Sequence, residues 1–330
     1  MREFGYERVL DVSGAVVLLG ADPDARFLGG GTNLVDLMKA GVERPALLVD
    51  ITGLPLDGVE FSHDSGLRIG ATVTNSDLAA HPDVRRHYPA LSQAVLAGAS
   101  GQLRNMATVG GNLLQRTRCG YFTDLSKPCN KRAPGSGCPA LTGEHHNHAI
   151  LGASEHCAAT HPSDMAVALA AFDAVISYET AEGPGELPIA DFYLPVGDTP
   201  HIETALPPGA LITGVTLPPA PVAAHSRYRK VRERASYAFA IGSIAAALDV
   251  QDDVVREVRL AFGAVASRPW RARAAERVLT GGPANAEAFA AAADAELAAA
   301  EALPENGYKV TLMRNLVVAV LTELTEEASR

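Results

Sequence analysis

Short apolar segments separated by turn-forming residues characterise the first 115 residues of the chain. Alternation of apolar and polar positions predicts strands, and longer apolar periodicity predicts helices. Strands are predicted to end at Phe27-Leu28 and to cover residues 46–51 and 66–73; helical segments are predicted over 33–39, from Leu78 onward and over 89–99. Thr74-Asn-Ser-Asp77 supplies an N-cap for the helix that begins near Leu78. Residues 14–20 form a further apolar run.

The C-terminal third has longer elements. Residues 238–250 and 254–265 predict two long strands, and Asp252-Asp253 between them indicates an antiparallel pair. Residues 284–302 contain twelve alanines and predict a helix by propensity alone. Residues 309–327 show a helical apolar stripe through Leu312, Leu316, Ala319, Val320 and Leu324. This third shows no candidate chemistry, and we interpret it as a packing or interface domain.

Between these regions, residues 116–159 lack periodicity and are rich in Gly, Pro, Cys, His and Asn. A loop of this length inside a compact domain is usually functional or held by a ligand. An apolar element over 164–174, a strand over 175–178 and a strand over 210–217 follow it.

Composition excludes several classes of function. The 330 residues are 47% hydrophobic and 20% charged, which is ordinary for a globular protein, and the net charge of −10 argues against nucleic-acid binding. The chain has no run of 18 apolar residues, so we expect no membrane span. Its N-terminus lacks the pattern of a signal peptide, so we expect cytoplasmic synthesis. A partner with a twin-arginine signal would be able to carry the folded chain to the periplasm.

Two glycine-containing loops are candidates for phosphate binding. Gly29-Gly-Gly-Thr-Asn33 and Ala107-Thr-Val-Gly-Gly-Asn112 both combine bare backbone with hydroxyl and amide donors. Neither matches the G-x-G-x-x-G fingerprint or a Walker P-loop. Two such loops in one domain favour a dinucleotide that is held from both sides, whereas a single loop would more often be a simple turn.

The four cysteines of the chain all lie in the aperiodic loop, at Cys119, Cys129, Cys138 and Cys157. The segment from Gln102 to Arg132 is also basic, with six Lys or Arg residues against Asp124. Four thiolates can hold an iron–sulfur cluster or a zinc ion. Zinc sites usually contain a short C-x2–4-C pair, which is absent, so the spacing favours a cluster. Zinc with mixed His and Cys ligands, disulfides and free thiols remain alternatives.

The motifs F-L-G-G-G-T-N-L and A-T-V-G-G-N-L resemble the FAD-binding medium subunits of molybdenum hydroxylases, the xanthine dehydrogenase and carbon monoxide dehydrogenase group. Pro162-Ser-Asp164 and Tyr228-Arg-Lys-Val-Arg-Glu-Arg234 match further signatures of that group. The cysteine loop resembles an insertion in the flavin subunit of periplasmic aldehyde oxidoreductases, which carries a [4Fe–4S] cluster. The resemblance implies an α+β fold: a PCMH-type FAD-binding domain of two subdomains over residues 1–220, with the insertion at about 116–160, and a smaller α+β domain over 221–330.

The resemblance also assigns roles to residues. It implies that Cys119, Cys129, Cys138 and Cys157 ligate one [4Fe–4S] cluster. It implies FAD contacts from the first glycine loop, the second loop and three separate positions, namely Phe27, Leu28, Gly29, Gly30, Gly31, Thr32, Asn33 and Leu34; Ala99, Thr108, Gly111 and Asn112; and Asp164, Ile212 and Lys230. Ile212 and Lys230 are both expected to flank the flavin end of FAD. An acid at the N-terminus of a helix is the alternative role for Asp164.

The implied function is electron transfer, and no catalytic residue is assigned. The partners would be a large subunit with the molybdenum cofactor and a small subunit with [2Fe–2S] clusters, in a heterotrimer that oxidises aldehydes and passes electrons through this chain to an external acceptor. A self-contained PCMH-type flavin oxidase, a flavin subunit like that of 4-hydroxybenzoyl-CoA reductase and a zinc-stapled interaction protein are the alternatives.

Overall fold

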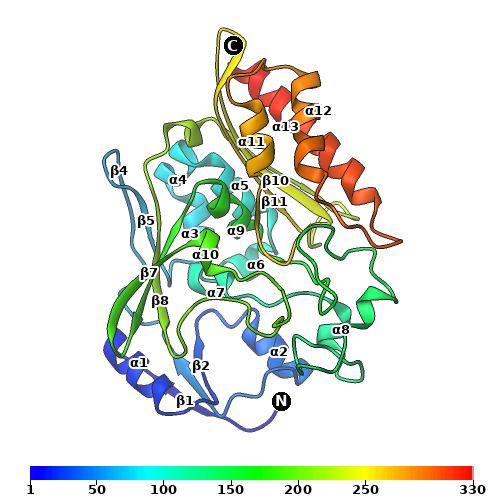
Figure 1. Cartoon of the computed structure of the whole chain (residues 1–330). Helices are drawn as coiled ribbons and strands as arrows, with labels where there is room; N and C mark the ends of the chain where they lie inside the picture. Colours follow the sequence, from blue (N-terminus) through cyan, green and yellow to red (C-terminus); the bar gives the residue numbers. More distant parts are fainter. Residues whose placement is uncertain (329–330) are drawn as a thin grey trace.

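The computed structural model describes residues 1–328, which form three sheets and the helices that cover them (Figure 1). The first sheet is parallel, with strands in the order β1 (Gly5–Arg8), β3 (Leu47–Asp50) and β2 (Ala25–Leu28). Helix α1 (Val12–Gly20) follows β1, and α2 (Leu34–Ala40) follows β2. The apolar run at residues 14–20 is therefore part of a helix, which the Asp11 carboxylate caps by accepting a hydrogen bond from the Gly14 N–H group at 2.7 Å.

The second sheet is antiparallel and has five strands, in the order β4 (Val59–Ser62), β5 (Gly66–Gly70), β8 (Leu211–Leu217), β6 (Val175–Thr180) and β7 (Gly183–Pro188). The helices that share its core are α3 (Asn75–Ala80), α4 (Pro82–His87), α5 (Pro89–Ala97) and α9 (Asp164–Ala171). Thr74 caps α3, as the sequence predicts: its hydroxyl accepts a hydrogen bond from the Asp77 N–H group.

The third sheet belongs to the C-terminal part, in the order β12 (Trp270–Arg271), β11 (Val254–Gly263), β10 (Gly242–Gln251) and β9 (Ser226–Val231). Strands β10 and β11 form the predicted antiparallel pair. Three helices cover one face of this sheet, namely α11 (Arg273–Leu279), α12 (Ala286–Leu297) and α13 (Tyr308–Ala328). In Figure 1 they lie at the top right, next to the yellow strands.

The apolar stripe of α13 differs from the prediction. Leu316, Val320 and Leu324 are buried as expected, but Leu312 and Ala319 are only half-buried. The side of the helix that faces the sheet also contains Met313, Val317 and Leu321. The stripe therefore packs against the helix's own domain and does not form an exposed interface.

Helix α9 lies between the second and third sheets, and all eight of its residues are buried. One side joins the core of the second sheet, and the other side contacts β10 and β11. The approach is close at Gly263, where a Cβ atom would lie 2.5 Å from Val167 Cγ2 and 2.3 Å from Ser243 Oγ. The alanine-rich sequence of α9 suits this narrow space.

The remaining elements are short, namely α6 (Gly101–Arg104), α7 (Val109–Leu113), α8 (Gly120–Thr123), η1 (Pro139–Leu141), α10 (Ile189–Phe192) and η2 (Pro221–Ala224). The predicted aperiodic loop contains only α8 and η1. Figure 1 shows it running along one edge of the molecule, from α2 towards the C-terminal helices. No helix in residues 1–328 has the length and apolar character that a membrane span needs.

The contact at Gly263 makes a stability prediction. Gly263→Ala should destabilise the fold by about 1–3 kcal/mol, because the new methyl group would overlap both Ser243 Oγ and the β-branched Val167 side chain, and both residues are buried. Urea unfolding followed by circular dichroism measures the change. Gly20→Ala is the matched control, since a Cβ atom there has open space around it. Adding Val167→Ala to Gly263→Ala should recover part of the loss; no recovery would contradict this packing.

Candidate functional site

The two glycine loops lie against each other. A Cβ atom on Gly30 would stand 1.6 Å from the carbonyl oxygen of Met106, so only glycine permits this backbone contact. Gly31 has a φ of +71°, in the left-handed region that favours glycine. Gly30 is therefore required by the packing of one loop on the other, and Gly31 by its backbone conformation. A bulky residue at Gly30 would disrupt the loop whether or not a ligand binds there.

The second loop is positioned by its own cap. The Thr108 hydroxyl accepts a hydrogen bond from the Gly111 N–H group at 3.2 Å and begins α7. The Ala107 carbonyl accepts a bond from the Asn75 N–H group at 2.8 Å, which ties the loop to α3. Both loops are thus fixed by backbone contacts before any ligand is considered.

A cavity of about 390 Å³ lies beside the first loop, and we call it the glycine cavity. Its wall includes most of the residues predicted to contact FAD in this region, namely Phe27, Gly29, Gly30, Gly31, Thr32, Asn33, Leu34, Thr108, Gly111 and Ile212. Leu28 is outside the wall: it follows Phe27 in β2, and successive side chains of a strand point to opposite faces.

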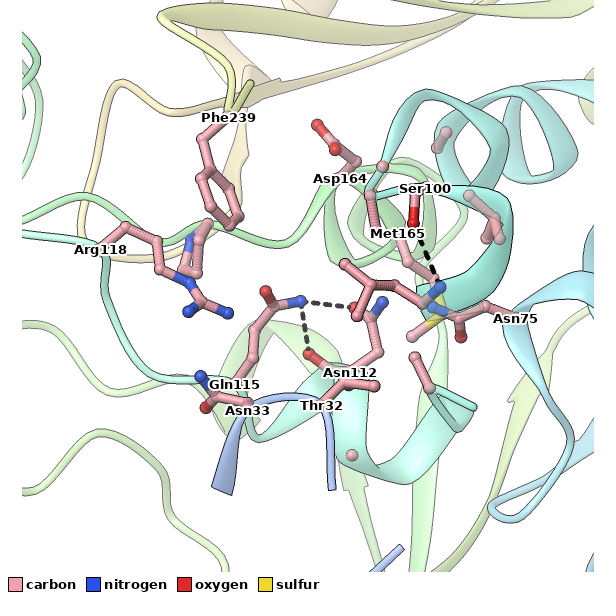
Figure 2. Close-up of a pocket in the computed structure, with 18 of the residues that line it drawn as sticks. Thr32, Asn33, Asn75, Ser100, Asn112, Gln115, Arg118, Asp164, Met165 and Phe239 are labelled. Carbon is pink, nitrogen blue, oxygen red and sulfur yellow. Dashed lines mark hydrogen bonds between the residues drawn. The ribbon is translucent and has the colours of Figure 1, made fainter. Parts of the chain in front are cut away.

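A second cavity of about 230 Å³ adjoins the first, and we call it the aspartate cavity. Thr32, Asn33 and Gly111 line both cavities, so the two meet at the glycine loops. Ala99, Asn112, Asp164 and Lys230 line only the aspartate cavity. Arg118 and Phe239 lie side by side in its wall in Figure 2, with the guanidinium carbon 4.8 Å from the ring centroid.

Ile212 and Lys230 lie in different cavities. The two cavities adjoin, and the expectation that both residues flank the flavin end of FAD stays a prediction. Ile212 comes from β8 in the second sheet, whereas Lys230 comes from β9 in the third sheet. The sequence motifs did not reveal that the two residues line different cavities.

Asp164 and Lys230 form a buried ion pair, with Lys230 Nζ 2.7 Å from Asp164 Oδ2. Lys230 also donates to the Ala97 carbonyl at 3.1 Å, and the Tyr228 hydroxyl donates to Asp164 Oδ1 at 2.5 Å. Burial and the neighbouring carboxylate raise the pKa of Tyr228 well above its usual value, which keeps its hydroxyl protonated as a donor. Tyr228 was not among the predicted site residues, although it is the first residue of the Tyr228–Arg234 motif.

Amide groups line the junction of the two cavities. Gln115 donates to Asn112 Oδ1 at 2.9 Å, and the Arg116 N–H group donates to Asn33 Oδ1 at 2.9 Å. The Asn33 Nδ2 group is buried and has no hydrogen-bond partner. An unpaired buried donor is costly, so this group fits a site where a ligand oxygen accepts its hydrogen bond.

The four cysteines line one small cavity in the aperiodic loop, which we call the thiol cavity, together with Phe122, Pro128, Lys131 and other residues. All four are free thiols; Cys129 and Cys157 are buried, and Cys119 and Cys138 are half-buried. The disulfide alternative is therefore not realised in this structure. Among residues 1–328, no group of three or more His, Cys, Asp or Glu side chains is arranged so that it could hold a metal ion.

Hydrogen bonds converge on the sulfur atoms. The Ala159 N–H group donates to Cys157 Sγ at 3.4 Å, and His148 Nε2 lies 3.3 Å from Cys119 Sγ. A hydrogen bond from the Cys157 thiol lowers the pKa of Cys138, and the same bond raises the pKa of Cys157. Four thiols with N–H donors around them are the donor set that an iron–sulfur cluster takes.

An open hollow of about 760 Å³ connects these sites. Arg118 and Phe239 belong both to this hollow and to the aspartate cavity, and Cys119 lies in the wall of the hollow and of the thiol cavity. Arg118 is adjacent to Cys119 in the chain. The aspartate cavity is therefore the part of the ligand site that faces the thiols.

Comparison with known proteins agrees with this arrangement. Residues 2–220 match the family model described as the FAD binding domain in molybdopterin dehydrogenase, and residues 226–324 match the CO dehydrogenase flavoprotein C-terminal domain. The chain is 52% identical over 329 residues to the aldehyde oxidoreductase FAD-binding subunit PaoB of Escherichia coli (strain K12), covering 99% of this chain and 100% of the relative. It is 27% identical to the putative xanthine dehydrogenase FAD-binding subunit XdhB of the same strain, covering 88% of this chain and 84% of the relative.

Solved structures show the same fold. Quinoline 2-oxidoreductase from Pseudomonas putida 86 matches with a TM-score of 0.78 at 22% identity, covering 100% of this chain and 99% of the other. Carbon monoxide dehydrogenase from Hydrogenophaga pseudoflava matches with a TM-score of 0.75 at 26% identity, covering 97% and 96%. The expected α+β fold is confirmed, and the chain belongs to the family of FAD-binding medium subunits of molybdenum hydroxylases.

Proposed function

We propose that this chain is the electron-transfer subunit of a molybdenum-dependent aldehyde oxidoreductase and that it holds FAD and one [4Fe–4S] cluster. The similarity to the aldehyde oxidoreductase subunit supports the aldehyde substrate. The convergence of Cys119, Cys129, Cys138 and Cys157 on one cavity carries the proposal of the cluster. Four cysteine thiolates are the ligand set that holds a [4Fe–4S] cluster in proteins.

In this proposal the diphosphate of FAD lies at the junction of the two cavities. Backbone N–H groups of the glycine loops and the unpaired Asn33 Nδ2 group would donate to its oxygens. The flavin ring would occupy the aspartate cavity, because that cavity borders the hollow that reaches Cys119. Lys230 would then flank the ring.

FAD when bound accepts and releases electrons, and the protein's contribution is to place it and to set its electrostatic surroundings. Lys230 presents a buried ammonium group to the aspartate cavity, and Asp164 with Tyr228 keeps that group in place. Val95 and Met165 are buried in the wall of this cavity, whereas Leu103 and Phe239 are exposed at its mouth. Substrate oxidation would take place on a large partner subunit with the molybdenum cofactor, and a small [2Fe–2S] subunit would deliver electrons to this chain for an external acceptor.

The metal content of the purified chain tests whether it holds the proposed cluster. Chain purified without oxygen should contain about four iron atoms and little zinc. Cys157→Ser should lose most of the iron and keep FAD, because the thiol cavity and the FAD cavities have separate walls. Elemental analysis and flavin absorbance measure both quantities. Glu155→Gln, a change at an exposed residue of the same loop, is the control and should keep its iron. About one zinc per chain without iron would refute the cluster.

Flavin occupancy tests the role of the second glycine loop. Gly111→Val should reduce FAD affinity about tenfold or more, since Gly111 lines the junction of the two cavities and a Cβ atom there would also stand 3.0 Å from the Thr108 hydroxyl that caps the loop. Gly101→Val is the matched control, because a Cβ atom there meets nothing within 4 Å and the residue lines neither FAD cavity. Equal FAD occupancy in both variants, measured by absorbance after dialysis, would contradict the placement of the diphosphate.

The division of labour is tested with the chain by itself. The purified full chain should not oxidise aldehydes, because substrate oxidation belongs to the partner subunit in this proposal. Dithionite should still reduce its flavin, and a quinone should reoxidise it. Steady aldehyde turnover by preparations free of molybdenum would show instead a self-contained oxidase.

A further inference from the structure

Glu203 joins the FAD site and the thiol site through two cations. It lies in the segment that follows α10, and its Oε1 atom is 2.6 Å from Lys131 Nζ. Its other carboxylate oxygen forms an ion pair with Arg116. Lys131 and Glu203 are 72 residues apart in the chain, so this contact exists only in the folded structure.

The two cations lie at different sites, Arg116 at the glycine cavity and Lys131 at the thiol cavity. Arg116 lines the glycine cavity, its N–H group donates to Asn33 Oδ1, and its guanidinium stacks on Phe122 at 4.8 Å from the ring centroid. Lys131 lines the thiol cavity and has a side chain that is only 6% exposed. Lys131 and Cys157 therefore line the same cavity.

Lys131 and Arg116 have few acidic partners. Glu203 is the one acid within ion-pair distance of Lys131 among residues 1–328. Arg116 has a second acid partner, Glu43, at 2.8 Å. His161 lies near Glu203, but burial lowers its pKa to about 4, so it is neutral near pH 7. Without Glu203, Lys131 would be a buried cation beside the thiols with no carboxylate partner.

We propose that Glu203 is a positioning residue that sets the reduction potential of the thiol-held metal centre. It holds Lys131 at the wall of the thiol cavity and cancels most of its positive charge. Reduction adds one electron to the centre, and a positive charge nearby stabilises the reduced form. Glu203 therefore keeps the potential of the centre lower than Lys131 alone would make it. This inference rests on the proposed [4Fe–4S] cluster.

The test uses the full chain with its metal centre loaded, in redox titrations followed by electron paramagnetic resonance. Glu203→Gln should keep its iron and shift the midpoint potential in the positive direction. Glu155→Gln is the control: it removes the same charge two residues from Cys157, but the Glu155 side chain is 87% exposed and water screens it. Its shift should be clearly smaller.

A double variant separates charge from structural damage. Lys131→Gln alone should shift the potential in the negative direction, and Glu203→Gln combined with Lys131→Gln should return it towards the wild-type value, as coupled residues do. If Glu203→Gln loses its iron, its potential cannot be measured, and Lys131→Gln then tests the inference: a negative shift of its midpoint potential supports it. An unchanged or positive shift in Lys131→Gln, or equal shifts in Glu203→Gln and Glu155→Gln, would overturn the inference. Wild-type chain without iron would instead overturn the proposed cluster.

Discussion

The buried ion pair between Asp164 and Lys230 is the contact on which the site depends. Asp164 begins α9, which belongs to the core of the second sheet, and Lys230 lies on β9 of the third sheet. A buried charge is tolerated only when it is paired and hydrogen-bonded, and here the Tyr228 hydroxyl and the Ala97 carbonyl complete the set. The pair therefore requires the two parts of the chain to meet at one position. The aspartate cavity lies at that position.

The packing of α9 explains why the cavity keeps its shape. The helix is buried along its whole length between two sheets, and small residues such as Gly263 let the third sheet approach closely. Close packing on both sides prevents the helix from shifting. Asp164, in its first turn, is thereby held at the edge of the cavity. The second glycine loop approaches the same end, where Ser163 donates to Asn112 Oδ1 at 2.5 Å.

The cysteine loop is ordered by a different means. It has little regular structure, and side chains bind its backbone instead. Arg132 donates to the carbonyl groups of Tyr121 and Phe122, and Lys309 of α13 donates to the His148 carbonyl at 3.0 Å. These bonds attach the loop both to itself and to the C-terminal domain. The four thiols consequently converge although their spacing in the chain is wide, and a bound cluster would add a cross-link to this scaffold.

The sequence by itself determined the elements whose signals are local. The Thr74 cap, the antiparallel pair of β10 and β11 and the alanine-rich helix α12 follow from capping, alternation and propensity, which depend on neighbouring residues. Motif chemistry likewise identified the cysteines and both glycine loops. Only the tertiary structure decided that Ile212 and Lys230 serve different cavities, that Gly30 is needed for contact with Met106, and that Glu203 meets Lys131. These relations join residues distant in the chain, and no local periodicity records which distant segments the fold brings together.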